Sequence, residues 1–127
     1  MVVEQPARAR VTSLRVRNAR EALLDASANL LLRSVRDIIC EPTRTQIVRV
    51  LSRGPLSVGE LAATLGRSKS ATSQHLRVLR DADVVFARRR GRIVTYSLGS
   101  TPLVAATVEV LDRAANASGE AVSASVD

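Results

Sequence analysis

Apolar residues recur three and four positions apart along most of this chain, which is the spacing of a helix that buries one face. The apolar residues of the first such stretch are Leu23, Leu24, Leu31, Leu32, Val35, Ile38 and Ile39. They predict one long helix over about residues 19–40. Asn18 is the expected N-cap of this helix, and Glu21 completes a capping box.

Two shorter helices are predicted next, and each has a recognisable start. Pro42 suits a first helical position, because the N–H that proline lacks has no partner within a helix there. Glu41 is then the residue that caps this helix. Ser57 followed by Glu60 predicts a second capping box, and Gly66 ends the short helix that follows it.

The stretch GRSKSATSQHLRVLRDADVV predicts a further helix with one apolar face and one hydrogen-bonding face. Ser68 is its expected N-cap, and Lys69–Asp81 its body. After it the apolar period changes to two, which is typical of strands. The pattern predicts a hairpin with strands at Val84–Arg89 and Arg92–Leu98, joined by a tight turn at residues 90–91.

Thr101 and Pro102 begin a final helix, and the apolar pattern stops near residue 116. We therefore expect three regions: a flexible basic arm over residues 1–17, a domain over residues 18–116, and a disordered tail over residues 117–127. The expected fold is mainly α with a small β-hairpin. A short helix, a turn and a second helix with a polar outer face indicate a helix-turn-helix, and the hairpin after it is a wing.

The charge of the chain favours DNA as the partner of this module. The formal net charge is +7, and most of it lies between Arg67 and Arg92, which hold eight basic residues against Asp81 and Asp83. Such a basic region favours a polyanionic partner. A major groove admits an α-helix, and the guanidinium groups of a wing suit phosphates or a narrow minor groove. A membrane surface is less suitable, because it requires a basic amphipathic helix.

The remaining composition narrows the class of protein. Cys40 is the one cysteine, which forbids an internal disulfide and fits a cytoplasmic protein. We see no secretory signal, and no segment apolar enough to span a bilayer. We find no paired carboxylates, nucleophile–base pair, phosphate-binding glycine loop or metal-binding cluster, so we expect neither an enzyme nor a cofactor.

Three separated blocks of the sequence resemble the ArsR-type winged-helix repressors. They are EPTRTQIVRVL, LSVGELAATLGRSKSATSQHLRVLRDADVV and RRRGRIVTYSL, and the resemblance extends over about Asp37 to Leu98. The resemblance implies a symmetric homodimer formed by the first and last helices. It also implies binding to a palindromic operator in double-stranded DNA and release on an inducer.

The sequence departs from the sensor sites of that family. SVGEL lacks the Cys-x-Cys of many metal sensors, and LVAATVEVLDRAANA contains no histidine. Thiol sensors of the family pair two cysteines, whereas this chain has Cys40 alone. Asp83 stands where a small glycine is common before the wing. We therefore expect a regulator that is not an obvious metal sensor, with an unknown effector.

The candidate DNA-binding residues lie on the second helix of the motif, just before it, and on the wing. They are Arg67, Ser68, Lys69, Ser70, Ser73, Gln74, His75, Arg77, Arg88, Arg89, Arg90 and Arg92. Ser73 and Gln74 are expected to approach base edges, because Gln can form a bidentate contact with adenine. Ser70 and Arg77 are expected to contact phosphates.

Two single residues allow more than one interpretation. His75 is the one histidine and has no cysteine or second histidine near it, so we expect a structural or phosphate-bonding role rather than metal binding. Cys40 is interpreted first as a small apolar core residue, with a redox role as the alternative. A thiol-responsive regulator and a winged helix that binds protein instead of DNA are the alternative functions.

Overall fold

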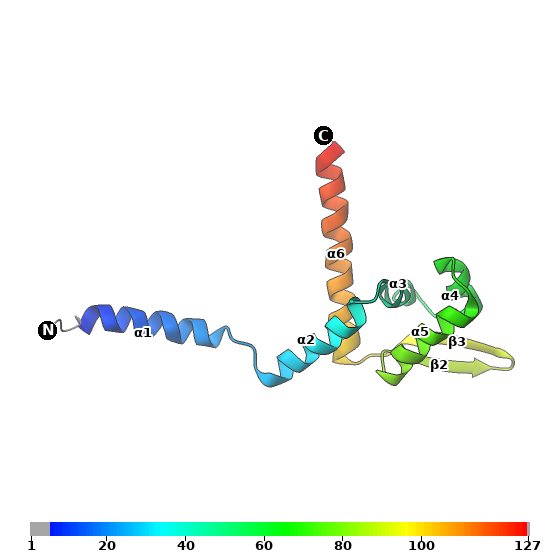
Figure 1. Cartoon of the computed structure of the whole chain (residues 1–127), viewed down its shortest axis with the longest axis horizontal. Helices are drawn as coiled ribbons and strands as arrows, with labels where there is room; N and C mark the ends of the chain where they lie inside the picture. The colour runs from blue at the N-terminus through cyan, green and yellow to red at the C-terminus, as the bar shows by residue number, and fades with distance from the viewer. Residues whose placement is uncertain (1–5, 127) are drawn as a thin grey trace. The chain divides into compact units, whose positions relative to one another are not determined.

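The computed structural model describes the backbone of residues 6–126 and the side chains of residues 12–119. Its helices are α1 (Pro6–Glu21), α2 (Ala26–Ile39), α3 (Pro42–Leu51), α4 (Val58–Leu65), α5 (Lys69–Asp81) and α6 (Pro102–Val126). Its strands are β1 (Leu56–Ser57), β2 (Val85–Arg90) and β3 (Ile93–Leu98) (Figure 1). The expected fold, mainly α with a small β-hairpin, is confirmed. The chain divides into two compact units at residues 30 and 31.

The first predicted helix is divided in two, which corrects the prediction of one helix over residues 19–40. Helix α1 ends at Glu21, and α2 begins at Ala26. Asp25 is the reason for the second start, because its Oδ1 accepts a hydrogen bond of 2.7 Å from the backbone N–H of Ala28. This contact satisfies one of the donors that a helix start leaves without a partner. Asn18, the expected N-cap, lies inside α1 instead.

The two ends of the chain have helical backbone in the structure. Helix α1 covers most of the expected basic arm, and α6 continues to Val126, beyond the expected end at residue 116. Residues 1–5 and 127 of the arm and tail lie outside the described backbone. The flexibility that we expect of both ends stays a prediction.

The helix starts of the central region are confirmed. Glu41 is the N-cap of α3 and accepts from the backbone N–H of Arg44 at 2.9 Å. Ser57 and Glu60 form the predicted capping box of α4. Gly66 ends α4 with a φ of 64°, a left-handed conformation that glycine adopts without a steric penalty. The short turn between α4 and α5 is therefore built from local contacts.

The core lies where α3, α4, α5 and the sheet meet. Its fully buried aliphatic side chains are Ile47, Val48, Leu61, Leu76, Leu79 and Val84. Thr72 and Thr107 are also buried, and each hydroxyl donates to the carbonyl four residues earlier, so neither of these two donors is left unpaired. Burying an aliphatic side chain of this size contributes about 1.5–3 kcal/mol. Helix α5 is therefore fixed to the domain through one face.

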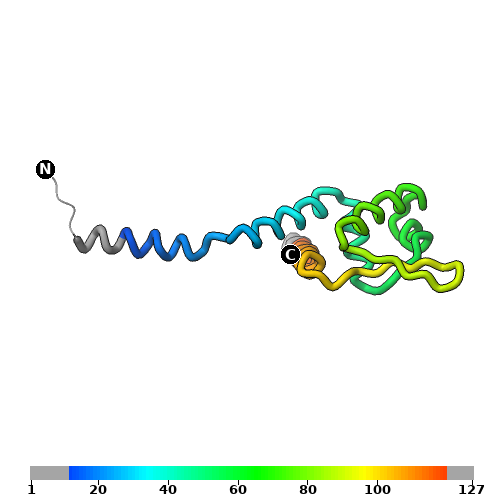
Figure 2. The backbone as a smooth tube through the Cα atoms, turned by 90° about the horizontal axis from the view of Figure 1, so that it is seen from below, coloured from blue at the N-terminus to red at the C-terminus, as the bar shows by residue number. Residues whose placement is uncertain are grey.

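The sheet has one strand more than the sequence predicted. Strand β1 pairs with β3, with Leu56 opposite Tyr96, and the strand order is β1-β3-β2. Strand β2 is shifted by one residue from its predicted bounds, and β3 begins one residue later than predicted and ends at Leu98 as predicted. Gly91 occupies the turn with a φ of 63°. β1 has two residues, too few to show an alternating pattern in the sequence. Figure 2 shows the hairpin turn extending past the helices of its unit.

Asp83 adopts the backbone conformation that glycine favours. Its φ is 57°, and among the described residues it is the one non-glycine with a positive φ. It follows the end of α5, where its backbone N–H donates to Arg80 and the next N–H, of Val84, donates to Leu79. Aspartate tolerates the left-handed region better than most residues. The connection from α5 to β2 therefore forms without glycine.

Candidate nucleic-acid interface

The polar face of α5 is exposed on the side opposite its buried face. Ser70, Ser73, Gln74 and Arg77 are all exposed, whereas Thr72, Leu76 and Leu79 are buried. The two sets follow from the period of 3.6 residues per turn, which places positions three and four apart on one side. The face that the sequence predicted for base and phosphate contacts is thus available to a partner.

This face lines a concave surface that includes two residues the sequence analysis missed. The concavity has a volume of about 340 Å³ and is lined by Ser70, Ser73, Gln74, Arg77, Arg80 and Tyr96. Arg80 could have been found from the sequence, because it stands three residues after Arg77 on the same helical face. Tyr96 could not, because it comes from β3 and reaches the helix only through the strand pairing.

The residues at the start of α5 have different surroundings. Arg67 is exposed. Ser68 is exposed too, but its Oγ accepts from the backbone N–H of Ala71 at 3.1 Å, so this hydroxyl caps α5. Lys69 lies against α4, where a Cβ added at Gly59 would be 3.4 Å from the Lys69 Cε. The Lys69 ammonium therefore lies beside the start of α4 as well as the start of α5.

The four wing arginines are exposed, but strand alternation divides them. Arg89 is paired with Val94, and Ala87 with Tyr96, so Arg89 shares the face that contributes Tyr96 to the concavity. Arg88 and Arg90 lie on the opposite face of the hairpin. Arg92 belongs to the turn beside Gly91. The alternation therefore places the wing arginines on both faces of the hairpin and in its turn.

His75 points inward from α5 and joins it to α3. Its side chain is 25% exposed, and its Nδ1 lies 3.7 Å from Oε2 of Glu41. The same carboxylate caps α3. This contact agrees with the structural role expected for His75 and places the ring away from the exposed polar face.

Cys40 is exposed, which corrects the interpretation of this residue as part of the apolar core. It follows the end of α2, where its Sγ lies 3.3 Å from the carbonyl oxygen of Asp37. The core at this point is filled by Ile38 instead. The apolar pattern does not show at which residue the helix ends. Because α2 ends at Ile39, Cys40 lies just beyond the helix, where it is exposed.

Neither a metal cluster nor a membrane span was found in the part of the chain that the structure describes. Within it, no three histidine, cysteine, aspartate or glutamate side chains come together in a way that could hold a metal ion. None of its helices combines the length and the apolar character that crossing a bilayer requires.

The helix-turn-helix α4–α5 and the arginine-tipped hairpin define the class of winged helix-turn-helix transcriptional regulators. Residues 41–86 match the family described as "Bacterial regulatory protein, arsR family". The chain is 38% identical to the HTH-type transcriptional regulator NmtR of Mycobacterium tuberculosis over 98 residues, which is 77% of this chain and 78% of the relative. It is 35% identical to the transcriptional repressor SdpR of Bacillus subtilis over 72 residues, covering 57% and 80% of the two chains.

Solved structures agree with these sequence matches. HlyU from Vibrio cholerae superimposes with a TM-score of 0.63 at 35% identity, covering 70% of this chain and 96% of that one. The chain therefore belongs to the ArsR family of DNA-binding transcriptional regulators. Our expectation that it is not a metal sensor receives no support from these relatives and stays a prediction.

The capping carboxylates of α3 and α4 lead to a prediction for stability against acid. The hydrogen bond from the Arg44 backbone lowers the pKa of Glu41 from 4.5, and hydrogen bonds from Ser57 lower the pKa of Glu60 from 4.5. A pKa that is lowered by folding adds stability above pH 4.5, and this stability is lost as the pH falls through the lowered value.

We expect the denaturant midpoint of the chain to fall between about pH 5 and pH 3, and Glu60→Gln to make this fall shallower. Glutamine keeps an oxygen that can accept at the cap but does not titrate. Urea unfolding followed by circular dichroism at several pH values measures the effect. If Glu60→Gln unfolds with the same pH dependence as the unaltered chain, the cap does not contribute in this way.

Proposed function

We propose that this chain is a homodimeric repressor that binds a palindromic DNA operator through α5 and the wing. The observation that supports this most strongly is the division of α5 into two faces. Thr72, Leu76 and Leu79 fix the helix to the core, so the polar residues Ser73 and Gln74 are held outward. A helix presented in this way fits a major groove, which displays a distinct pattern for each base pair.

The residues of the interface divide into two proposed roles. Ser73 and Gln74 read base edges, while Ser70 and Arg77 beside them contact phosphates. The other proposed phosphate contacts are Arg67, Lys69, Arg80, Arg88, Arg89, Arg90 and Arg92, all of them exposed basic residues. Tyr96 lines the same concavity and offers a hydroxyl to the backbone of the DNA.

Dimer formation is proposed through α2 and α6. Large apolar side chains are exposed on both helices, and on α2 these are Leu30, Leu32 and Ile39. On α6, Val110 is 40% exposed. Members of this family act as dimers, and a two-fold dimer places two recognition helices about one turn of DNA apart. Repression is part of the proposal, and the relative SdpR, a transcriptional repressor, supports it.

Selection of bound sites from random double-stranded DNA tests the proposal. We expect a palindrome with half-sites about one helical turn apart. If the dimer covers six to ten phosphates, affinity falls on the order of a thousandfold between about 50 and 200 mM salt. No enriched site together with a flat salt dependence would favour a winged helix that binds protein.

The same selection of bound DNA sites, repeated with divalent metals, reductant and oxidant, tests whether one of these agents changes operator binding. The exposed thiol of Cys40 makes a thiol-responsive regulator the second candidate function. In that case oxidant changes operator affinity in the unaltered chain and not in Cys40→Ser. Equal responses of both chains would remove Cys40 from the mechanism, and a response to metal would correct our expectation about metal sensing.

The wing assignment predicts the effect of a double variant. Arg90→Ala with Arg92→Ala is expected to weaken binding to all DNA sequences and to make the salt dependence shallower, because phosphate contacts carry no sequence information. Fluorescence anisotropy with operator and random duplexes at several salt concentrations measures this. Arg113→Ala, an exposed arginine of α6, is the control. Unchanged affinity of the double variant would remove the wing from the interface.

Gln74 carries a separate prediction about specificity. Gln74→Ala is expected to relax base preference at one position in each half-site, at a cost of about 1–3 kcal/mol on the preferred sequence. Site selection repeated with the variant identifies that position. An equal loss of affinity on every sequence would instead make Gln74 a contact to the DNA backbone.

A further inference from the structure

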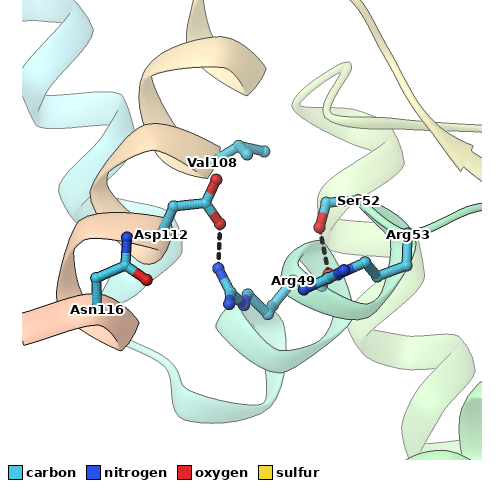
Figure 3. Close-up of a pocket in the computed structure, with 6 residues that line it drawn as sticks. All are labelled: Arg49, Ser52, Arg53, Val108, Asp112 and Asn116. Carbon is cyan, nitrogen blue, oxygen red and sulfur yellow. Dashed lines mark hydrogen bonds and ion pairs between the residues drawn. The ribbon is translucent and has the colours of Figure 1, made fainter. Parts of the chain in front are cut away.

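A second cavity lies between α3 and α6, away from the polar face of α5. Its volume is about 440 Å³, and its lining residues are Arg49, Ser52, Arg53, Val108, Asp112 and Asn116 (Figure 3). None of these residues lines the concavity over α5. A volume of this size lies within the usual range for small-molecule sites, about 300–1,000 Å³.

The charges of this cavity are unequal, and one positive charge is unmatched. Arg49 of α3 forms an ion pair with Asp112 of α6, which crosses the cavity (Figure 3). Arg53 also lines the cavity and is exposed, and its guanidinium has no ion pair or side-chain hydrogen bond within residues 12–119. Two guanidinium groups thus face one carboxylate.

The other lining groups favour a polar ligand. Val108 is the one apolar residue of the lining. The Ser52 hydroxyl donates to the carbonyl oxygen of Arg49 at 2.5 Å and still offers lone pairs to a ligand donor. Asn116 presents an amide, which both donates and accepts (Figure 3). An apolar or aromatic ligand would make few apolar contacts in this cavity.

We propose that this cavity binds a small organic anion through Arg53 and Arg49. The carboxylate or phosphoryl group of the ligand pairs with Arg53 and competes with Asp112 for Arg49. A guanidinium binds either group through two parallel N–H donors, and this geometry makes arginine well suited to such ligands. The ion pair with Asp112 shows that a carboxylate can bind the Arg49 guanidinium from the α6 side.

The position of the cavity suits a ligand that regulates DNA binding. This effector role rests on the proposed function. Helix α3 contacts both α5 and α6. Its N-cap, Glu41, faces His75 of α5, and its last turn carries Arg49. A ligand that displaces Asp112 alters the link between α3 and α6, the helix proposed for the dimer. Operator affinity and ligand affinity are then coupled, and the coupling is reciprocal.

Binding is tested on the DNA-free chain, so its outcome does not depend on the proposed DNA function. Isothermal titration with inorganic phosphate and with succinate, at constant ionic strength set by sodium chloride, distinguishes a phosphoryl from a carboxylate ligand. We expect saturable binding of one of the two probes. Arg53→Gln is expected to weaken it about tenfold, because a charge-assisted contact is lost.

Two further variants separate this site from general attraction of anions. Asp112→Asn is expected to bind the probe several-fold more tightly, because it releases Arg49 and removes a competing charge; loss of folding cannot produce that gain. Arg113→Gln is the matched control, an exposed arginine of α6 outside the cavity lining. Absence of binding to the unaltered chain, or an equal loss in Arg113→Gln and Arg53→Gln, would overturn the site.

The effector claim has its own measurement. At matched ionic strength, operator affinity is expected to change at least threefold in the unaltered chain at saturating probe, and Arg53→Gln is expected to need about tenfold more probe for the same change. Unchanged operator affinity while the probe is bound would overturn the effector role and leave the binding site standing. Failure to find an operator at all would contradict the proposed function and not the anion site.

Discussion

Burial of one face of α5 is the interaction on which the rest of this structure depends. Thr72, Leu76 and Leu79 lie in the core with α3, α4 and the sheet, and their burial fixes both the position and the rotation of the helix. Rotation matters because a helix that turned by one residue would carry its polar face sideways by about 100°. The DNA-reading role proposed for α5 requires that this rotation be fixed.

Hydrogen bonds at the starts of the helices support the same arrangement. Glu41 caps α3, Ser57 and Glu60 cap α4, and Ser68 caps α5, so each of the three core helices begins at a defined residue. A serine N-cap such as Ser57 or Ser68 typically contributes about 1 kcal/mol. Because Glu41 also faces His75, the start of α3 is linked to the middle of α5. The caps therefore set helix ends, while the core sets helix positions.

Helix α3 occupies a central place between the two proposed sites. One end of it meets α5 through Glu41 and His75, and the other end meets α6 through Arg49 and Asp112. Both contacts lie at partly exposed positions, where solvent screening keeps the contribution of a polar contact small. Weak links of this kind can be broken by a competing ion, whereas the buried contacts cannot.

The sequence by itself determined the helices from Pro42 to Asp81, their caps, the hairpin and the outward polar face of α5, because these follow from contacts between near neighbours. It did not predict the break between α1 and α2, where Asp25 starts a new helix within an unbroken apolar pattern. The tertiary structure alone decided the pairing of β1 with β3, the exposure of Cys40 and the presence of Tyr96 beside α5. It also decided the cavity between α3 and α6. The exposure of Cys40 follows from the end of α2 at Ile39. The other features join residues that are far apart in the chain, and one sequence carries no periodic signal for such contacts.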